Sequence, residues 1–374
     1  MIKRVFLLLA ILSIILSGCA SQGQSTDQEK LYIAVTGALT GPSAQDGQEI
    51  KRGAELAVDN INANGGINGK QVALVFEDDR SDPKEAANIA NKLVNDSRIL
   101  AVIGHYNSSC TLAGAPIYNK AGLVEISGGS TSPAVSQAGP YTFRVIVTDA
   151  EQGDYVTKWM VKELGFKNVV IMYENDDYGA GLKDVIDMKV TEYGGKVLGI
   201  ESYYLGQTKD FTPYITKLRA LNPDALFIAG LYNEAALIAK QAADVGWTPP
   251  IFGTDGFYTQ ALIDMGGKAV EGVRVSGYFF SGNPDPAVQD FVAQIKTKYN
   301  VVPGAYTANG YDAMMVLAEA IKKNGADRGK INDYLTTLKG YKGLTGTISF
   351  DENGDAMKDP LKLQVVDGQF TIVK

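Results

Sequence analysis

Two clusters of hydroxyl side chains in this sequence could hold an anion. In the first, Ser108 and Ser109 follow an apolar run that ends at Gly104, and they open a segment with a helical pattern. The first turn of a helix presents unpaired N–H groups and the positive end of the helix dipole, so these serines and their amides could bind a carboxylate or a phosphate. From the residues alone, simple N-capping by either serine is the alternative.

The second cluster is Gly-Gly-Ser-Thr-Ser, residues 128–132. It also follows an apolar run, and Gly129 leaves the backbone open to close approach by a ligand. Ser130 and Thr131 supply hydroxyls at the mouth of the predicted strand. A polar turn without a ligand is the alternative, but two such clusters at neighbouring strand ends favour a binding site.

Residues suited to a cation lie further along the chain. Asp255 stands between small residues after an apolar run and could pair with an ammonium, while Tyr178 could place its ring face against the same group. A turn aspartate and a packing tyrosine are the alternatives. Because one half of the chain supplies groups for an anion and the other supplies groups for a cation, the sequence predicts a site for a zwitterion.

The sequence contains few of the residues and motifs on which common enzyme active sites are built. The sequence contains one histidine, His105, and two cysteines, Cys19 and Cys110, which excludes sites built on two histidines and zinc clusters of the usual spacing. It has no phosphate-binding P-loop, dinucleotide-binding glycine turn or hydrolase nucleophile elbow. We therefore expect no enzymatic activity, no cofactor and no metal. Cys110 is expected to be a free thiol near the site, either reactive or simply buried.

The elements that would position these residues alternate along the chain. Short apolar runs such as Leu31–Gly37 and Leu100–Gly104 predict strands, and amphipathic patterns such as Pro83–Asn95 predict helices. A second series of alternating helices and strands begins after Thr148 with a predicted helix over Asp149–Leu164. This pattern indicates an α/β fold of two doubly wound, Rossmann-like lobes joined by a hinge. Ligands bind beyond the carboxyl ends of the strands in such sheets, where the polar clusters stand.

The lobes should be discontinuous in sequence. We predict lobe 1 over residues 31–148 and 279–358, and lobe 2 over residues 149–278 and 359–374. Two late helical patterns, between residues 286 and 323, motivate this division because they arrive after lobe 2 has completed its own strand and helix series.

The N-terminus has the pattern of an export signal. Lys3 and Arg4 precede an apolar run that is too short to span a bilayer, and small residues lead to Cys19. This resembles the bacterial lipoprotein signal, with residues 1–19 removed up to a lipidated Cys19 and residues 20–30 acting as a flexible leash. An ordinary signal with an incidental cysteine is the alternative. The expected location is the cell envelope, in the periplasm or on the outer face of the cytoplasmic membrane. The formal net charge of −7 excludes nucleic acid as a partner and leaves the lipid as the contact with the membrane.

From about Leu31 onward, the chain resembles the type I periplasmic binding proteins of the branched-chain amino acid (Leu/Ile/Val) receptor family. The matching segments are Gly41-Pro-Ser-Ala-Gln45, Gly104-His105 with Ser108-Ser109, Ile126-Ser127 before Ser130-Thr131, Tyr178-Gly179, Gly230 with Tyr232-Asn-Glu234, and Gly253-Thr-Asp-Gly256. The resemblance implies the substrate-binding lipoprotein of an ABC importer. Such a protein would act as a monomer, capture an amino acid by hinge closure and deliver it to permease subunits.

Carried over by position, the resemblance assigns roles to the residues above. It implies that Ser108 and Thr131 bind the carboxylate of the ligand, and that the backbone near Gly129 and Ser130 contacts its α-substituents. Tyr178 would close over the ligand from lobe 2. Asp255 would hold the ammonium in place of the glutamate that is usual in the family.

Two positions depart from the family pattern. Asp46 stands where an aromatic residue commonly packs on the ligand side chain, and Leu231 stands where a tyrosine is expected, with Tyr232 next to it. Asp46 would either face the pocket and favour a polar or cationic ligand group, or point to solvent. In the second case Tyr106, Tyr232 or Tyr306 would close the pocket. The alternative function is a lipoprotein of the same fold that regulates envelope enzymes, or that binds an amide or a carboxylic acid.

Overall fold

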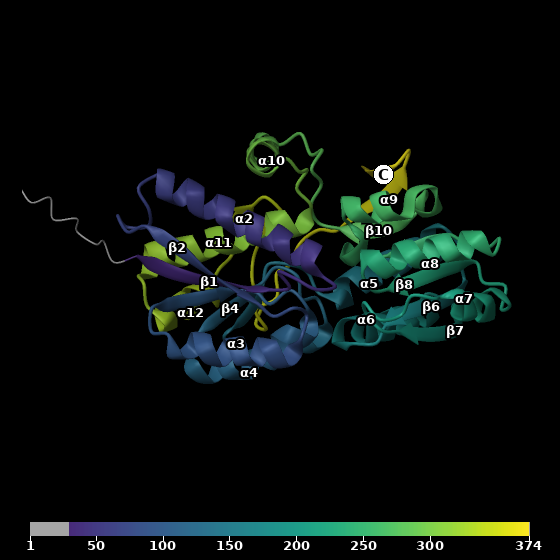
Figure 1. Cartoon of the computed structure of the whole chain (residues 1–374), viewed down its shortest axis with the longest axis horizontal. Helices are drawn as coiled ribbons and strands as arrows, with labels where there is room; N and C mark the ends of the chain where they lie inside the picture. The colour runs from purple at the N-terminus through teal and green to yellow at the C-terminus, as the bar shows by residue number, and fades with distance from the viewer. Residues whose placement is uncertain (1–29, 374) are drawn as a thin grey trace, which may run out of the picture.

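The computed structural model describes residues 30–373. The predicted signal, the lipidation site Cys19 and the leash up to residue 29 lie outside the described residues. Two lobes lie side by side along the longest axis of the molecule (Figure 1). No described helix combines the length and the apolar composition that a membrane span requires.

Lobe 1 is built on a parallel sheet with the strand order β2-β1-β3-β4-β5. Its strands are β1 (Leu31–Gly37), β2 (Val72–Asp78), β3 (Ile99–Ile103), β4 (Val124–Ser127) and β5 (Thr142–Arg144). The connecting helices are α2 (Ala44–Ala63), α3 (Pro83–Asn95) and α4 (Ser108–Ala121). Helix α2 lies on one face of the sheet, and α3 and α4 lie on the other (Figure 1). The doubly wound arrangement expected from the sequence is confirmed.

Lobe 2 has the strand order β14-β13-β10-β9-β8-β6-β7, in which β13 and β14 are antiparallel additions to a parallel sheet. The strands are β6 (Asn168–Glu174), β7 (Lys196–Tyr203), β8 (Ala225–Ala229), β9 (Ile251–Gly253), β10 (Arg274–Gly277), β13 (Leu361–Val366) and β14 (Gln369–Ile372). The helices are α5 (Asp149–Thr157), α6 (Asp177–Glu192), α7 (Thr212–Arg219), α8 (Tyr232–Asp244) and α9 (Gln260–Gly266).

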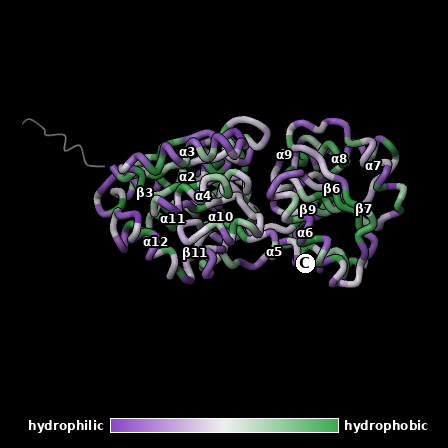
Figure 2. Tube along the Cα trace, turned by 90° about the horizontal axis from the view of Figure 1, so that it is seen from below, coloured by the Kyte–Doolittle hydropathy of each residue, from purple (hydrophilic) through white to green (hydrophobic). Residues whose placement is uncertain are grey.

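Both faces of the lobe 2 sheet are buried, as expected of a parallel sheet between helices. Val169 and Ile171 belong to the core shared with α5 and α6, whereas Val170 and Met172 belong to the core shared with α7 and α8. Hydrophobic residues follow strands such as β6 and β9 in Figure 2, which places the core along the sheet.

The late helices are α10 (Pro286–Tyr299), α11 (Ala305–Asn324) and α12 (Arg328–Leu335), followed by a hairpin of β11 (Tyr341–Gly343) and β12 (Gly346–Ile348). Helix α11 packs along α2, and the two backbones approach closely at two glycines. A Cβ on Gly53 would lie 1.9 Å from the Thr307 carbonyl oxygen, and one on Gly310 would lie 2.1 Å from that of Ile50. This close packing fixes the start of α11, where Tyr306 stands.

The chain passes between the two sheets after β5, after β10 and before β13. The carboxyl ends of the parallel strands in both lobes face this boundary, so the residues that follow β3, β4, β8 and β9 meet there.

Candidate ligand-binding site

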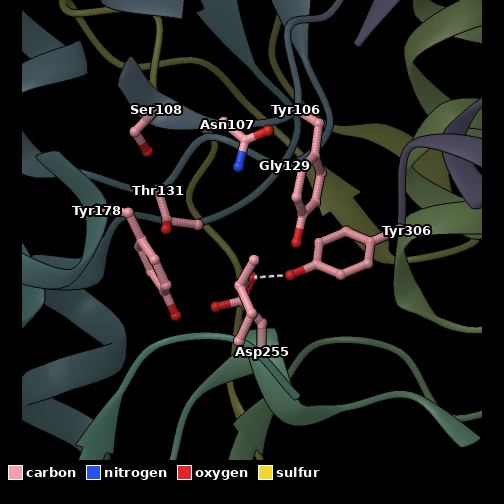
Figure 3. Close-up of a pocket in the computed structure, with 9 residues that line it drawn as sticks. Tyr106, Asn107, Ser108, Gly129, Thr131, Tyr178, Asp255 and Tyr306 are labelled. Atoms are coloured by element: carbon pink, nitrogen blue, oxygen red, sulfur yellow. Dashed lines mark hydrogen bonds between the residues drawn. The ribbon is translucent and has the colours of Figure 1, made fainter. Parts of the chain in front are cut away.

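A narrow cavity lies between the two lobes. It is lined by Tyr106, Asn107, Ser108, Gly129, Thr131, Tyr178, Leu231, Asp255 and Tyr306 (Figure 3). The side chains that line it come from both lobes, so a solute bound there would contact both.

The lobe 1 wall presents hydroxyl groups at the start of α4 and after β4. Asn107 is the N-cap of α4 and Ser108 is its first residue. The Ser108 Oγ accepts a hydrogen bond of 3.2 Å from the amide of Ser132, so its own proton is available to an anion. The Thr131 Oγ1 is buried and makes no full hydrogen bond among residues 30–373, although it lies near the buried Asp149 carboxyl and helps to stabilise its charged form. Both hydroxyls can donate to a carboxylate in the cavity.

The loop after β4 is fixed by a dense hydrogen-bond network. The Ser127 hydroxyl donates to the His105 carbonyl (2.6 Å) and accepts from the amides of Gly129 (3.2 Å) and Ser130 (2.9 Å). This network holds the backbone of residues 127–130 against the end of β3.

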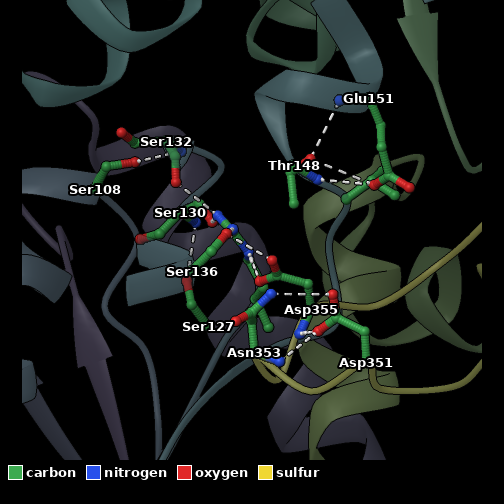
Figure 4. A network of polar contacts seen from close by, with 12 residues as sticks. Ser108, Ser127, Ser130, Ser132, Ser136, Thr148, Glu151, Asp351, Asn353 and Asp355 are labelled. Carbon is green, nitrogen blue, oxygen red and sulfur yellow. Dashed lines mark hydrogen bonds and ion pairs between the residues drawn. The ribbon is translucent and has the colours of Figure 1, made fainter. Parts of the chain in front are cut away.

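The buried Arg144 guanidinium donates to the carbonyls of Ser132 (2.9 Å) and Ser130 (3.2 Å). Figure 4 shows both serines within a polar network that extends to Asp355. The Arg144 Nε pairs with Asp355 Oδ1 at 2.5 Å, which compensates the buried charge. Because Arg144 holds the carbonyls on either side of Thr131, it positions that residue toward the cavity.

The lobe 2 wall presents a carboxyl group. Asp255 opens a short 3₁₀ turn (Asp255–Phe257) after β9, and its amide donates to the Gln152 Oε1 at 3.2 Å. Its Oδ2 accepts a hydrogen bond of 3.0 Å from the Tyr306 hydroxyl, while Oδ1 is buried without a partner in the described part of the chain. Burial raises the pKa of Asp255 above its usual value. An ammonium beside Oδ1 would favour the ionised carboxylate.

Tyr178 and Leu231 complete the lobe 2 wall. Tyr178 lies in the first turn of α6, and its hydroxyl is 3.1 Å from the Thr254 Oγ1, which fixes the direction of the ring. Leu231 is the N-cap of α8 and adds an apolar surface. The cavity thus combines hydroxyls on one wall, a carboxyl on the other and aromatic and aliphatic side chains between them.

Comparisons with known proteins agree with this geometry. A model of the family described as "Periplasmic binding protein" matches residues 30–369. Leu/Ile/Val-binding protein homolog 1 of Brucella suis biovar 1 is 34% identical over 322 residues, which cover 85% of this chain and 85% of that protein. The chain belongs to the periplasmic binding protein family, in its branched-chain amino acid group.

Solved structures of this group have the same architecture. A leucine binding protein, LivK, from Thermotoga maritima is 34% identical with a TM-score of 0.86, and the match covers 92% of this chain and 98% of that one. The substrate-binding protein LivJ from Streptococcus pneumoniae, solved in complex with isoleucine, is 29% identical with a TM-score of 0.86, covering 92% and 99%. Proteins of the periplasmic binding protein family are extracytoplasmic solute-binding proteins.

Of the site residues predicted from the sequence of this binding protein, the structure places six in the cavity wall. These are Tyr106, Ser108, Gly129, Thr131, Tyr178 and Asp255. Asn107, Leu231 and Tyr306 also line it; Tyr306 was expected only as one of three residues that could close the pocket, Leu231 only as a departure from the family pattern, and Asn107 not at all. Their sequence signals were the position before the serine cluster, the position after β8 and an aromatic residue at the start of a late helix.

Three predicted site residues, Ser130, Asp46 and Tyr232, do not line the cavity. The Ser130 hydroxyl is turned under the loop and donates to the carbonyl of Tyr106 at 3.0 Å. Asp46 is fully buried, and its Oδ2 accepts a hydrogen bond of 2.7 Å from the Tyr106 hydroxyl. It therefore lies behind the cavity wall and away from solvent, so the expectation that it points to solvent is wrong. Of the tyrosines named with that alternative, Tyr106 and Tyr306 line the cavity. Tyr232 is buried in the first turn of α8, one residue beyond the wall.

Cys110 and His105, the two residues whose side chains could have been reactive, are both buried in the protein interior. Cys110 is buried in α4, forms no disulfide within the described residues, and burial raises the pKa of its thiol, which disfavours the reactive thiolate. His105 is buried, with Nδ1 2.6 Å from Asp79 Oδ2 and Nε2 3.2 Å from the Tyr118 hydroxyl. No group of metal-binding side chains occurs in the part of the chain that the structure describes.

Proposed function

We propose that this binding protein captures an amino acid, branched-chain or related, in the cavity between its lobes and delivers it unchanged to the permease of an ABC importer. One observation carries the proposal: opposite walls present unpaired polar atoms of complementary type. Thr131 Oγ1 on lobe 1 suits a carboxylate, and Asp255 Oδ1 on lobe 2 suits an ammonium. Leaving such buried atoms unpaired is costly, and a zwitterion would satisfy both.

The nature of the remaining wall supports an amino acid with an apolar side chain. Leu231 and the rings of Tyr106, Tyr178 and Tyr306 surround the rest of the cavity. The relatives named for leucine, isoleucine and valine support the same class.

Hinge closure would couple capture to transport. The carboxylate is held from lobe 1 and the ammonium from lobe 2, so a bound amino acid favours the closed over the open arrangement. Hydrogen bonds between described residues also cross the rim of the cavity. The Asn233 Nδ2 donates to the Pro42 carbonyl at 2.9 Å, and the Asp177 amide donates to the Ser109 Oγ at 3.3 Å.

The proposal includes the lobe boundaries at residues 31–148 with 279–358 and at 149–278 with 359–374. The packing of α11 along α2 and the pairing of β13 with β10 support them. It also includes a monomer tethered to the envelope membrane through lipidated Cys19, with residues 20–30 as the leash.

Thermal unfolding with a panel of amino acids tests the function. A ligand at 100 times its Kd should add about 2.7 kcal/mol to the free energy of unfolding, and each deaminated analogue should add far less. If a carboxylic acid without an ammonium stabilised the protein equally, the ligand would belong to the alternative class. If no small solute stabilised it, a same-fold regulator would be the better account.

A further inference from the structure

Asp46 is a buried carboxyl group directly behind the cavity wall. Its Oδ2 accepts the hydrogen bond from the Tyr106 hydroxyl, and Oδ1 has no partner from any residue that the structure describes. Tyr106 lines the cavity and Asp46 does not. The hydrogen bond that joins Asp46 to the cavity wall therefore runs through the Tyr106 ring.

The Tyr106 ring is held on three sides. One face packs directly on the backbone of Gly129, where an added Cβ would lie 2.4 Å from the Tyr106 Cδ2. The Tyr306 ring meets it edge to face, with the centroids 5.1 Å apart and an interplanar angle of 88°. The contacts with Gly129 and Tyr306 orient the body of the ring, whereas the hydrogen bond to Asp46 fixes its hydroxyl tip. Asp46 thus determines where the ring stands within its packing.

The position of this ring decides how much room one end of the cavity offers. Figure 3 shows Tyr106 and Tyr306 together on the side of the cavity opposite Tyr178, away from the Ser108 hydroxyl. In the proposed complex, the hydroxyl wall fixes the carboxylate of the amino acid and Asp255 fixes its ammonium. The side chain of the ligand would then point toward the rings of Tyr106 and Tyr306.

We propose that Asp46 is a specificity-determining positioning residue, which sets the size of ligand side chain that the cavity accepts by holding the Tyr106 hydroxyl. The inference rests on the proposed function and deepens it. In this inference Asp46, a polar residue outside the cavity, selects among ligands that differ in the size of an apolar side chain.

The energetic setting of Asp46 supports a functional role. Burial and the nearby Glu49 raise the pKa of Asp46, so the site disfavours a charged carboxylate. Asp46 Oδ1 is buried without a hydrogen bond among the described residues, which costs stability. Such local conflicts are expected at functional positions.

The test compares binding constants for a series of amino acids, alanine, valine, leucine and phenylalanine, by calorimetric titration. Asp46→Ala should shift the ratio of affinities toward the larger members by on the order of tenfold, the scale on which a pocket discriminates a methylene group. Tyr106→Phe should produce the same shift, and the double variant should add nothing further. Asp46→Asn keeps an oxygen acceptor for the Tyr106 hydroxyl and should restore the parental ratio.

A matched control separates specificity from stability. Asp312 is also a buried carboxyl, and it accepts a hydrogen bond of 2.6 Å from the Thr345 hydroxyl. It does not line the cavity, so Asp312→Ala should destabilise the fold without changing the ratio of affinities. Parental ratios in Asp46→Ala would overturn the inference and leave the function standing. If Asp46→Ala did not fold, parental ratios in Tyr106→Phe would overturn it. A parent protein that bound no amino acid would overturn both proposals.

Discussion

The Tyr306 hydroxyl donates a hydrogen bond of 3.0 Å to the Asp255 Oδ2 across the boundary between the lobes. Tyr306 belongs to α11, which packs on the lobe 1 helix α2, and Asp255 follows a strand of the lobe 2 sheet. The bond occupies one carboxylate oxygen and leaves Oδ1 for a ligand. The Asp255 carboxyl group therefore contacts lobe 1 through one oxygen and can contact the ligand through the other, which couples lobe closure to ligand binding.

Replacing Tyr306 with phenylalanine tests this link. Tyr306→Phe keeps the ring but removes the donor to Asp255, and hydrogen bonds to charged groups contribute roughly 1.5–3 kcal/mol. We expect amino acid affinity to fall by about 10- to 150-fold in a calorimetric titration. Tyr311→Phe is the control, because that hydroxyl accepts from Asn60 outside the cavity. Equal losses in the two variants would contradict a specific role for Tyr306.

The hydroxyl wall should contribute to affinity through donors to the carboxylate. Ser108→Ala and Thr131→Ala each remove one donor, and each should weaken binding by roughly 1.5–3 kcal/mol in the same titration. Ser130→Ala is the comparison, because its hydroxyl bonds the Tyr106 carbonyl and should affect the unfolding temperature more than the affinity. A Thr131→Ala protein that bound at parental affinity would remove Thr131 from the site.

A rim contact should tune affinity without touching the ligand. Asn233→Ala removes the hydrogen bond to the Pro42 carbonyl across the lobes. Loss of one such bond should weaken binding by roughly 0.5–1.5 kcal/mol, mainly through faster dissociation. Stopped-flow measurement of the dissociation rate checks this. Asn91→Ala, on the exposed face of α3, should leave the rate unchanged, and an unchanged rate in Asn233→Ala would rule out a latch at this rim.

Glu125 should make stability depend on pH. It is buried in β4, its Oε1 accepts from the Thr142 hydroxyl at 2.9 Å, and burial raises its pKa to about 8. Between its ordinary pKa near 4.5 and this value, the folded state binds more protons than the unfolded state, so stability falls as pH rises.

Glu125→Gln removes this titration and keeps the oxygen acceptor for Thr142. We expect the variant to gain stability over the parent by on the order of a few kcal/mol at pH 8, and to differ little at pH 4.5. Urea unfolding at several pH values measures it. Parallel pH profiles for the two proteins would show that Glu125 does not titrate with folding.

Local sequence patterns predicted the long elements well. The predicted helix Pro83–Asn95 coincides with α3, because Asp82 caps it, Pro83 starts it and its apolar positions share one face. The predicted helix Asp149–Leu164 is instead α5 followed by a π-helical segment, Lys158–Glu163. Helix α12 was missed because its buried positions are few within a short polar segment.

The site was predictable where a strand end fixes a residue's place. Ser108 and Asp255 come within five residues of the end of a strand, so the sheets place them at the lobe boundary. The Ser130 hydroxyl does not reach the cavity, because neighbouring hydroxyls in one loop can face opposite sides and only the hydrogen bonds decide which. The role of the backbone near Gly129 and Ser130 stays a prediction. The position of Asp46 depends on Tyr106, which is 60 residues away in sequence, and no local pattern contains that contact.

Titration of Asp255→Asn with the amino acid that the parent binds most tightly tests the central claim most directly. Asparagine keeps the shape of the side chain but removes the charge that would pair with the ammonium. A zwitterion held between the two lobes predicts a loss on the order of 2–5 kcal/mol, roughly 30- to 4,000-fold in Kd. Parental affinity in this variant would contradict the account and point to an amide or a carboxylic acid as the natural ligand.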